Sequence, residues 1–280
     1  MLTLAASSGH AIGIALAMIF VLGVGAQWLA WKIKIPSILL LLLMGILAGP
    51  VMRSVFPNSA FAINPDTLFD SDVLLAAVGM AVGLILYEGG LTLNFKELQS
   101  TWKPVTLLVT LGALVTWIIA AFSVYLIFDL SRPIAILIGA ILIVTGPTVV
   151  GPLLAHIRPS GDSGLILKWE GIVIDPIGVL AAVLVFEAIS ADSQLNDITS
   201  ILQAIGITLV AGTLIGLLAA LILQTLLTRF WVPDYLQNPV SLMLVVAAFT
   251  ASNEFMPESG LLATTVMGIA LGNQKKVDVH

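Results

Sequence analysis

The chain has 280 residues, of which 59% are hydrophobic and 10% charged, with a mean hydropathy of +1.10 and a net charge of -5. Soluble domains carry about 25% charged residues, so this composition excludes a soluble fold and predicts an all-α integral membrane protein. The sequence has no cysteine, which excludes disulfides, thiol nucleophiles and cysteine-ligated metals. The acids lie mostly between the apolar runs, so the negative charge does not indicate a nucleic-acid partner.

Apolar runs separated by proline, glycine and charged residues predict about nine transmembrane helices, because a bilayer core about 30 Å thick needs about 20 residues per helix. The predicted spans are residues 10–31, 36–56, 72–90, 104–128, 133–155, 164–190, 201–228, 239–255 and 260–272. The first run has no basic segment before it and is too long for a signal peptide, so we expect a retained helix.

Basic residues predict the orientation of these helices. Nine of the 11 lysines and arginines lie at the ends of spans that meet one side of the membrane, and only Arg53 and Arg132 lie at the other. Cytoplasmic loops are enriched in lysine and arginine, so we predict a multi-pass protein of the cell (inner) membrane with its N-terminus outside and its C-terminus in the cytoplasm. Indoles prefer the membrane interface, and five lie near the predicted cytoplasmic boundary: Trp28, Trp31, Trp102, Trp169 and Trp231.

A short internal echo predicts a repeat. The sequence MGILAGP at Met44–Pro50 ends the second span, and MGIALGN at Met267–Asn273 ends the ninth. The two spans cross the membrane in opposite directions, which is the arrangement of inverted repeats in secondary transporters. We predict a first repeat of six transmembrane helices in residues 1–190, a connecting transmembrane helix and loop in 191–235, and the start of an incomplete, inverted second repeat in 236–280.

Asp175 is the main candidate for chemistry. It lies about eleven residues into the sixth span, roughly 16 Å deep and near the membrane midplane. A charge there costs about 2.5–3.5 kcal/mol, so such residues tend to mark ion or proton pathways, although a structural acid neutralised by a partner is the alternative. Pro176 has no N–H and leaves the carbonyl of Ile172 as a candidate ligand.

The fifth span is predicted to be a broken helix near Thr145–Pro147. Pro147 releases the carbonyl of Ile143, and Gly146 adds backbone freedom. Unwound backbone at this depth must line a cavity or be buried in protein, which makes these residues candidate ligands. The alternative is a proline kink whose free groups are satisfied by neighbouring helices.

Glu170 lies about 140° around the helix from Asp175, so the two carboxylates do not share a face. Glu170 is either an ion ligand or half of a structural pair with Lys168 or with an arginine of another helix. The three histidines are peripheral, and no pair of them has the spacing of a metal site.

Three motifs in order resemble the sodium/proton exchanger branch of the monovalent cation:proton antiporters. They are LYEGGL at 86–91, TGPTVVGPLL at 145–154 and WEGIVIDP at 169–176. The resemblance implies that a broken helix crosses an acidic helix at the ion site, that Asp175 is the carrier carboxylate, and that Thr145 contributes near the crossover. It also implies that Glu170 corresponds to a glutamate that pairs with an arginine in later helices. Ile174 and Gly146 stand where the family often has asparagine and aspartate.

The resulting hypothesis is exchange of Na+, with K+ or Li+ as alternatives, for H+, in which Asp175 binds either the cation or the proton. We expect no enzymatic activity, no cofactor and no resident metal, and we expect membrane lipid and a second copy of the chain, as a homodimer, as partners. One alternative is a truncated membrane fragment or scaffold that does not transport. Another is a potassium-efflux antiporter of the same fold.

Overall fold

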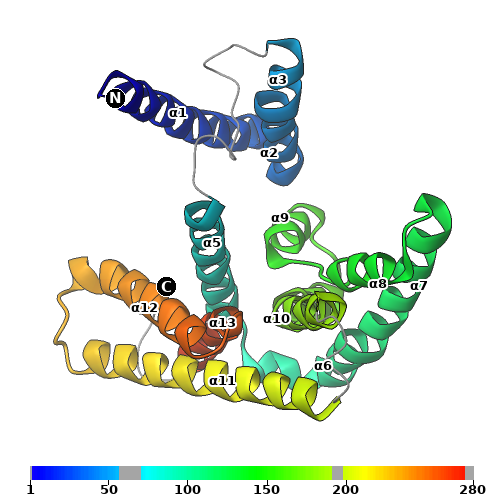
Figure 1. Cartoon of the computed structure of the whole chain (residues 1–280). Helices are drawn as coiled ribbons and strands as arrows, with labels where there is room; N and C mark the ends of the chain where they lie inside the picture. The colour runs from blue at the N-terminus through cyan, green and yellow to red at the C-terminus, as the bar shows by residue number, and fades with distance from the viewer. Residues whose placement is uncertain (1, 57–70, 191–197, 275–280) are drawn as a thin grey trace. The chain divides into compact units, whose positions relative to one another are not determined.

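The computed structural model describes residues 2–56, 71–190 and 198–274 (Figure 1). Every regular element in these ranges is helical, which confirms the predicted all-α class. The connections 57–70 and 191–197 lie outside the described residues, as do residues 275–280 with Lys275 and Lys276, which contribute to the predicted orientation.

The transmembrane helices follow the predicted pattern closely. In the described part of the chain, 7 helical stretches are long and apolar enough to cross a membrane: Ile12–Ile33, Ser37–Val55, Ser71–Leu91, Phe95–Phe128, Ser163–Phe186, Gly206–Thr228 and Asp234–Phe255. Two shorter apolar helices, Arg132–Ile141 and Ser259–Gly272, overlap the predicted fifth and ninth spans. The predicted count of about nine is therefore correct as an approximate number.

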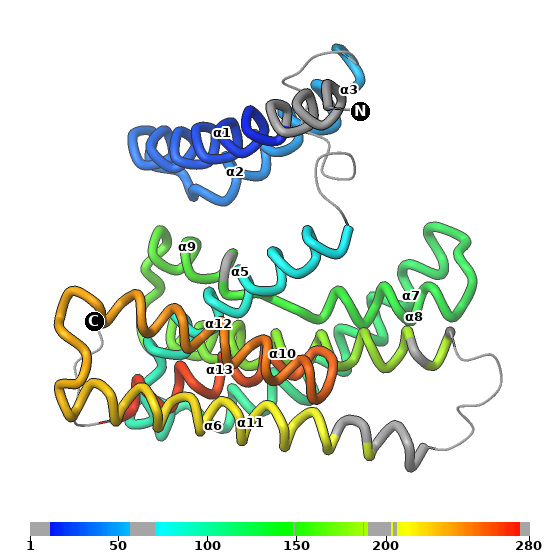
Figure 2. Tube along the Cα trace, turned by 60° about the vertical axis from the view of Figure 1, so that its left-hand side comes forward, coloured from blue at the N-terminus to red at the C-terminus, as the bar shows by residue number. Residues whose placement is uncertain are grey.

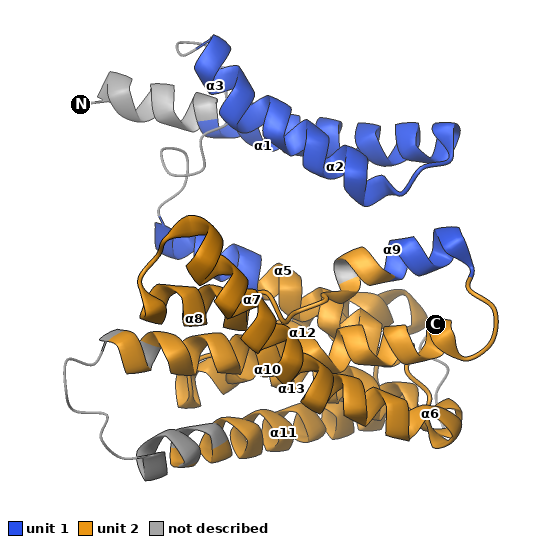
Figure 3. Ribbon diagram, turned by 90° about the vertical axis from the view of Figure 1, so that its right-hand side faces the viewer, with its two compact units in different colours: residues 1–79, 151–158 blue, residues 80–150, 159–280 orange. Residues whose placement is uncertain are grey.

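The chain divides into two compact units, residues 1–79 with 151–158 and residues 80–150 with 159–280 (Figure 3). In the first unit, helix α1 (Leu2–Ile33) packs on α2 (Ser37–Ile46) through Ala26, Ala30 and Leu40. Beyond α2 the chain continues through a π-helical turn, η1 (Leu47–Val51), into α3 (Met52–Val55). Pro50 lies inside this turn, where the irregular hydrogen bonding accommodates its missing N–H.

The second unit contains two groups of helices. The first comprises α6 (Phe95–Leu107), the π-helical turn η2 (Leu108–Gly112), α7 (Ala113–Phe128), α8 (Arg132–Ile141), the start of α9 (Pro147–Ile157) and α10 (Ser163–Ser190). The C-terminal part of α5 (Ser71–Leu91) packs with the second group, where Tyr87 shares a buried core with Leu223 and Met267. In the first group, α10 packs against both α6 and α8, and α7 packs along α8 (Figure 1). Trp169, Ile172 and Ile174 of α10 form a buried core with Val105 and Val109.

The second group comprises α11 (Ile198–Thr228), a short 3-10 turn η3 (Asp234–Leu236), α12 (Gln237–Phe255) and α13 (Ser259–Gly272). Helix α13 packs against both α11 and α12 (Figure 2). Glycines make this packing close, because a Cβ atom at Gly212 of α11 would lie 2.9 Å from the carbonyl oxygen of Ser259. Small residues at such positions let transmembrane backbones approach one another.

Four of the five tryptophans predicted at the membrane boundary are exposed, and Trp169 is buried. Three exposed indoles each lie near a basic group: Lys32 Nζ is 5.1 Å from the Trp28 ring, Lys103 Nζ 5.9 Å from Trp102, and the Arg229 guanidinium 5.5 Å from Trp231. Trp169 is only 3% exposed, and its ring centroid lies 5.9 Å from that of Phe95. Packing of α10 against α6 buries this indole, so it does not belong to the interfacial set.

Candidate functional site

The predicted helix break is present. Helix α8 ends at Ile141, α9 begins at Pro147, and residues 142–146 between them are not helical. Pro147 occupies the first position of α9, where its missing N–H costs no helical hydrogen bond. The carbonyl of Gly146 accepts the amides of Val149 and Val150 at 3.1 and 3.2 Å and so begins the new helix. The local chemistry of proline and glycine thus ends one helix and starts the next.

Helix α10 contacts this break through two glycines. A Cβ atom at Gly171 would lie 3.1 Å from the carbonyl oxygen of Thr145, and one at Gly178 would collide with the side chain of Val144. Gly171 and Gly178 are seven residues apart, so they lie on the same face of the helix. The absence of side chains on this face lets the break pass close to the backbone of α10.

Asp175 lies on the same face of α10. It follows Gly171 by four residues and precedes Gly178 by three, which places it within about 60° of both around the helix. Its side chain is half-buried, and it has no hydrogen-bond partner among the described residues. The helical spacing therefore places Asp175 on the face of α10 whose glycines contact residues 144 and 145 of the break.

Glu170 contacts the break directly. The hydroxyl of Thr145 donates a hydrogen bond of 2.7 Å to Oε1 of Glu170, whose residue is only 9% exposed. Among the described residues, Glu170 and Lys168 form no ion pair with each other, because the ammonium of Lys168 donates to the carbonyl of Thr92 at 2.9 Å. Residues two apart on a helix point in nearly opposite directions, which explains why these neighbours do not meet.

A cavity of about 270 Å³ lies beside this hydrogen bond. Its walls come from η2 and α7, from the break and from α10, and they include Thr116, Ile143, Thr145 and Glu170. Ile143 is itself 5% exposed. Asp175 is not among the lining residues, so the two carboxylates of α10 face different surroundings, as their angular separation predicts.

The other predicted backbone ligands lie inside a regular helix. Helix α10 continues through Pro176 without a break, and Ile172 is 2% exposed. The Cδ1 methyl group of Ile172 packs near Gly89 of α5, where a Cβ atom would lie 3.2 Å from it. The structure thus places Ile172 and Pro176 in α10 and places Ile143, Gly146 and Pro147 at the break.

Sequence reasoning missed three residues of this region. Gly171 and Gly178 bracket Asp175 at helical spacing, and this pattern is visible in the sequence once the face of α10 is considered. Thr116 is a hydroxyl in an otherwise apolar part of the fourth span, one turn after the π-helical turn η2. Such turns are frequent at functional sites, but nothing in the sequence predicts one here.

No cluster of candidate metal ligands lies in the described ranges. No group of three or more histidine, aspartate or glutamate side chains within these ranges is arranged to hold a metal ion. The region around the break is therefore the strongest candidate site in the described part of the chain.

Comparison with known proteins finds a matching family and similar sequences. A family model described as "Sodium/hydrogen exchanger, transmembrane" matches residues 14–279. The chain is 27% identical over 267 residues to Na(+)/H(+) antiporter 1 of Methanocaldococcus jannaschii, a match that covers 92% of the chain and 59% of that protein. It is also 26% identical over 249 residues to the K(+)/H(+) antiporter NhaP2 of Shewanella sp. (strain ANA-3), covering 87% of the chain and 40% of the relative.

A solved structure has a similar fold. The sodium proton antiporter MjNhaP1 from Methanocaldococcus jannaschii at pH 8 superimposes with a TM-score of 0.73 at 25% identity, covering 94% of the chain and 62% of that structure. The chain thus spans about 60% of the length of the M. jannaschii proteins that it matches.

Proposed function

The chain belongs to the sodium/hydrogen exchanger family, and we propose that it carries the ion site of a secondary transporter that exchanges a monovalent cation for H+. Relatives named as Na+/H+ antiporters and as K+/H+ antiporters both support cation/proton exchange. We assign Na+ as the cation, because the M. jannaschii Na+/H+ antiporter matches over the larger share of both chains. K+ and Li+ are the alternatives.

Asp175 is the proposed carrier. The observation that supports this role is its position between Gly171 and Gly178, on the face of α10 that contacts the break. A carboxylate can bind a proton or a cation but not both, so competition for one group couples the two fluxes. Moving the empty, charged carboxylate through a low-dielectric core carries a penalty of several kcal/mol, which suppresses uncoupled return.

Thr145 and the backbone of the break are the proposed co-ligands. The Thr145 hydroxyl and the carbonyl of Ile143 lie in or beside the non-helical segment, and Gly146 and Pro147 set its course. Oxygen ligands of this kind suit a hard monovalent cation. Glu170 accepts the Thr145 hydroxyl, so we assign it first as a positioning residue for Thr145, with direct ion binding as the alternative. The carbonyl of Ile172, freed by Pro176, is a further candidate ligand.

We further propose that the chain lies in the cell (inner) membrane with its C-terminus in the cytoplasm, and that it forms a homodimer. The basic–indole pairs at Trp28, Trp102 and Trp231 support a shared interface at the predicted cytoplasmic ends of the helices. The proposed repeats, residues 1–190 and 236–280 joined by 191–235, gain support from the similar hairpins α1–α2 and α12–α13. Each hairpin turn contains a proline and a residue of positive φ, Lys34 (58°) in one and Glu258 (65°) in the other.

Sodium-dependent proton flux in proteoliposomes tests the proposal. We expect an imposed Na+ gradient to move protons with the wild-type chain, background flux with D175N, and partial flux with D175E, which keeps the carboxylate. Wild-type flux from D175N would overturn the role of Asp175. Replacing Na+ by K+ or Li+ in the same assay identifies the cation.

A second candidate is a membrane fragment that does not transport alone. The observation that favours it is that the chain covers 59% of the M. jannaschii relative. In that case the 280-residue chain gives background flux, and flux appears when it is extended at the C-terminus by the corresponding part of the relative. Flux from the unextended chain would exclude this candidate.

A further inference from the structure

The two basic residues predicted on the outer side of the membrane share an unusual setting. Arg53 and Arg132 lie in different units, yet each lines a groove whose other walls are almost entirely apolar. Each groove runs between two helices that follow one another in the chain, α1 with α2 to α3 in one case and α7 with α8 in the other. The positive-inside pattern disfavours arginine on this side, so both residues are candidates for a binding role.

The groove between α7 and α8 has a volume of about 560 Å³, and its lining includes the aromatic side chains of Trp117, Phe122 and Tyr125. The guanidinium of Arg132 lies 6.0 Å from the ring of Tyr125. The indole N–H of Trp117 donates to the carbonyl of Ile136 at 3.0 Å, so its polar atom is already satisfied and its ring remains as an apolar wall. The charge of Arg132 is therefore the strongest polar feature of this groove.

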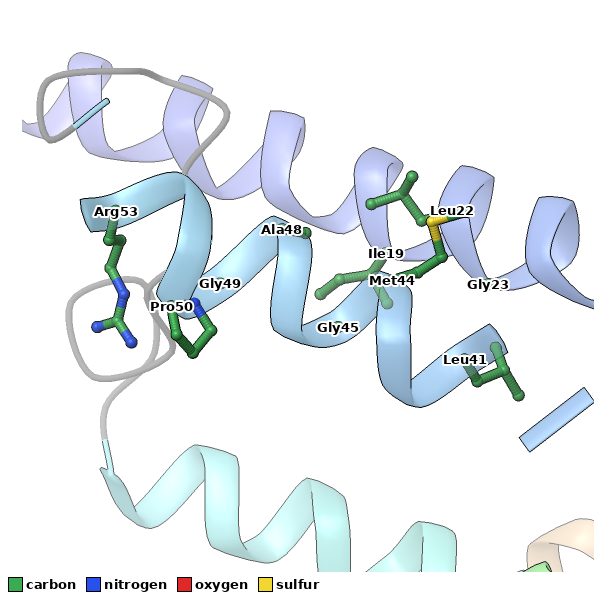
Figure 4. Close-up of a pocket in the computed structure, with 10 residues that line it drawn as sticks. All are labelled: Ile19, Leu22, Gly23, Leu41, Met44, Gly45, Ala48, Gly49, Pro50 and Arg53. Carbon is green, nitrogen blue, oxygen red and sulfur yellow. The ribbon is translucent and has the colours of Figure 1, made fainter. Parts of the chain in front are cut away.

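The groove on α1 and α2 has a volume of about 530 Å³ and is likewise lined by apolar residues and one arginine (Figure 4). Arg53 lies at one end and Leu41 at the other, with Met44 between them. Gly23 of α1 and Gly45 of α2 leave it open, since a Cβ atom at either position would meet nothing within 4 Å.

The dimensions of both grooves match one leaflet. Leu114 to Tyr125 of α7 covers about 16 Å at 1.5 Å per residue, and Leu41 to Arg53 covers about 18 Å, against about 15 Å for half of the hydrocarbon core. A transmembrane helix from another chain would need a groove about twice as long. The volumes lie within the range of about 300–1,000 Å³ that holds small ligands.

We propose that each groove binds one phospholipid, with an acyl chain along the apolar walls and the phosphate on the guanidinium of Arg53 or Arg132. Arginine binds phosphate with two parallel hydrogen bonds, and an arginine near a helix end places its charge at headgroup depth. Tyr125 supports this depth, because tyrosine rings also prefer the interface. The proposal does not depend on the transported ion.

Native mass spectrometry of the detergent-purified chain tests this assignment. With phosphatidylglycerol as the probe, we expect R132Q and R53Q each to weaken one binding event by about tenfold or more, because each loses a charged hydrogen-bond partner. R158Q is the matched control, since Arg158 lines neither groove, and should bind like the wild type. Equal binding by R132Q, R53Q and the wild type would overturn the proposal.

A headgroup comparison on the wild-type protein removes any dependence on how the variants fold. Diacylglycerol with the same acyl chains should bind at least about tenfold more weakly, because it lacks the phosphate. Inorganic phosphate at millimolar concentration should not displace the lipid, since it lacks the acyl chain. Diacylglycerol that binds as tightly as phosphatidylglycerol, phosphate that displaces it, or a dimer that excludes lipid from both grooves would each contradict a phospholipid site.

Discussion

Two places in the second unit use glycine to bring stretches of backbone together. Where α5 meets α13, a Cβ atom at Gly90 would lie 2.9 Å from the carbonyl oxygen of Thr265, and one at Gly268 would collide with the carbonyl of Tyr87. Where α10 meets the helix break, a Cβ atom at Gly171 would lie 3.1 Å from the carbonyl oxygen of Thr145. The packing device is the same in both places.

The polar groups at the two crossings differ. Helix α13 has no ionisable residue, and its Thr264 and Thr265 hydroxyls donate to the carbonyl of Leu261 at 3.0 and 2.7 Å. Helix α10 carries Glu170, which is held by Thr145, and Asp175, which has no hydrogen-bond partner among the described residues. An ionisable side chain within a transmembrane helix lowers the stability of the folded protein, so it is retained where it has a function. We therefore interpret the α5–α13 crossing as a structural contact and expect chemistry where α10 meets the break.

The largest expected effect on stability is the difference between alanine at a glycine in close contact with backbone and alanine at a glycine with free space around it. We expect G268A to lower the free energy of unfolding by about 1–3 kcal/mol, because the new methyl group collides with backbone that cannot move freely. Gly45 is its counterpart in the sequence echo and has nothing within 4 Å of a Cβ atom, so G45A should change stability by no more than about 0.5 kcal/mol. Denaturant unfolding in detergent measures both, and equal losses would show that the α5–α13 crossing is not specially packed.

A smaller loss of stability with a larger loss of transport is expected at the second crossing. G178A places a methyl group against the Val144 side chain, which can shift, so the stability cost should be near the lower limit of about 1 kcal/mol. Proton flux should nevertheless fall clearly below that of the wild type, because the displacement of Val144 moves the break relative to Asp175. G151A is the control, since a Cβ atom there meets nothing within 4 Å. G178A with wild-type flux would place the transport site away from this contact.

The smallest effect concerns one hydrogen bond. T145A removes the hydroxyl that donates to Glu170 and should cost about 0.5–1.5 kcal/mol, whereas T145S keeps the donor and should cost less. A double-mutant cycle of T145A with E170Q measures the coupling free energy between the two side chains. A coupling energy near zero would mean that Glu170 does not hold Thr145.

The sequence predicts those features that depend on neighbours along the chain. Pro147 and Gly146 determine the break through their own backbone chemistry, and the apolar runs determine the spans, so both are confirmed. The Thr145–Glu170 hydrogen bond joins the break to α10, and it depends on how α10 packs on the break. Burial of Trp169 has the same origin, because a local pattern cannot reveal that α6 covers it.

The groove at Arg132 shows the same limit. The positive-inside count identifies Arg132 as an exception, but only packing of α7 on α8 shows the apolar walls beside it. Patterns along the chain thus identify individual groups, and tertiary contacts decide which of them act together.

Competition between Na+ and H+ at Asp175 is the central claim, and proton release on sodium binding measures it most directly. Adding Na+ to the purified protein in weakly buffered detergent solution, at a pH where Asp175 is protonated, should release protons in proportion to the Na+ bound. D175N should release none, while G45A should behave as the wild type. Proton release from D175N equal to that of the wild type, or sodium binding by the wild type without proton release, would contradict the account.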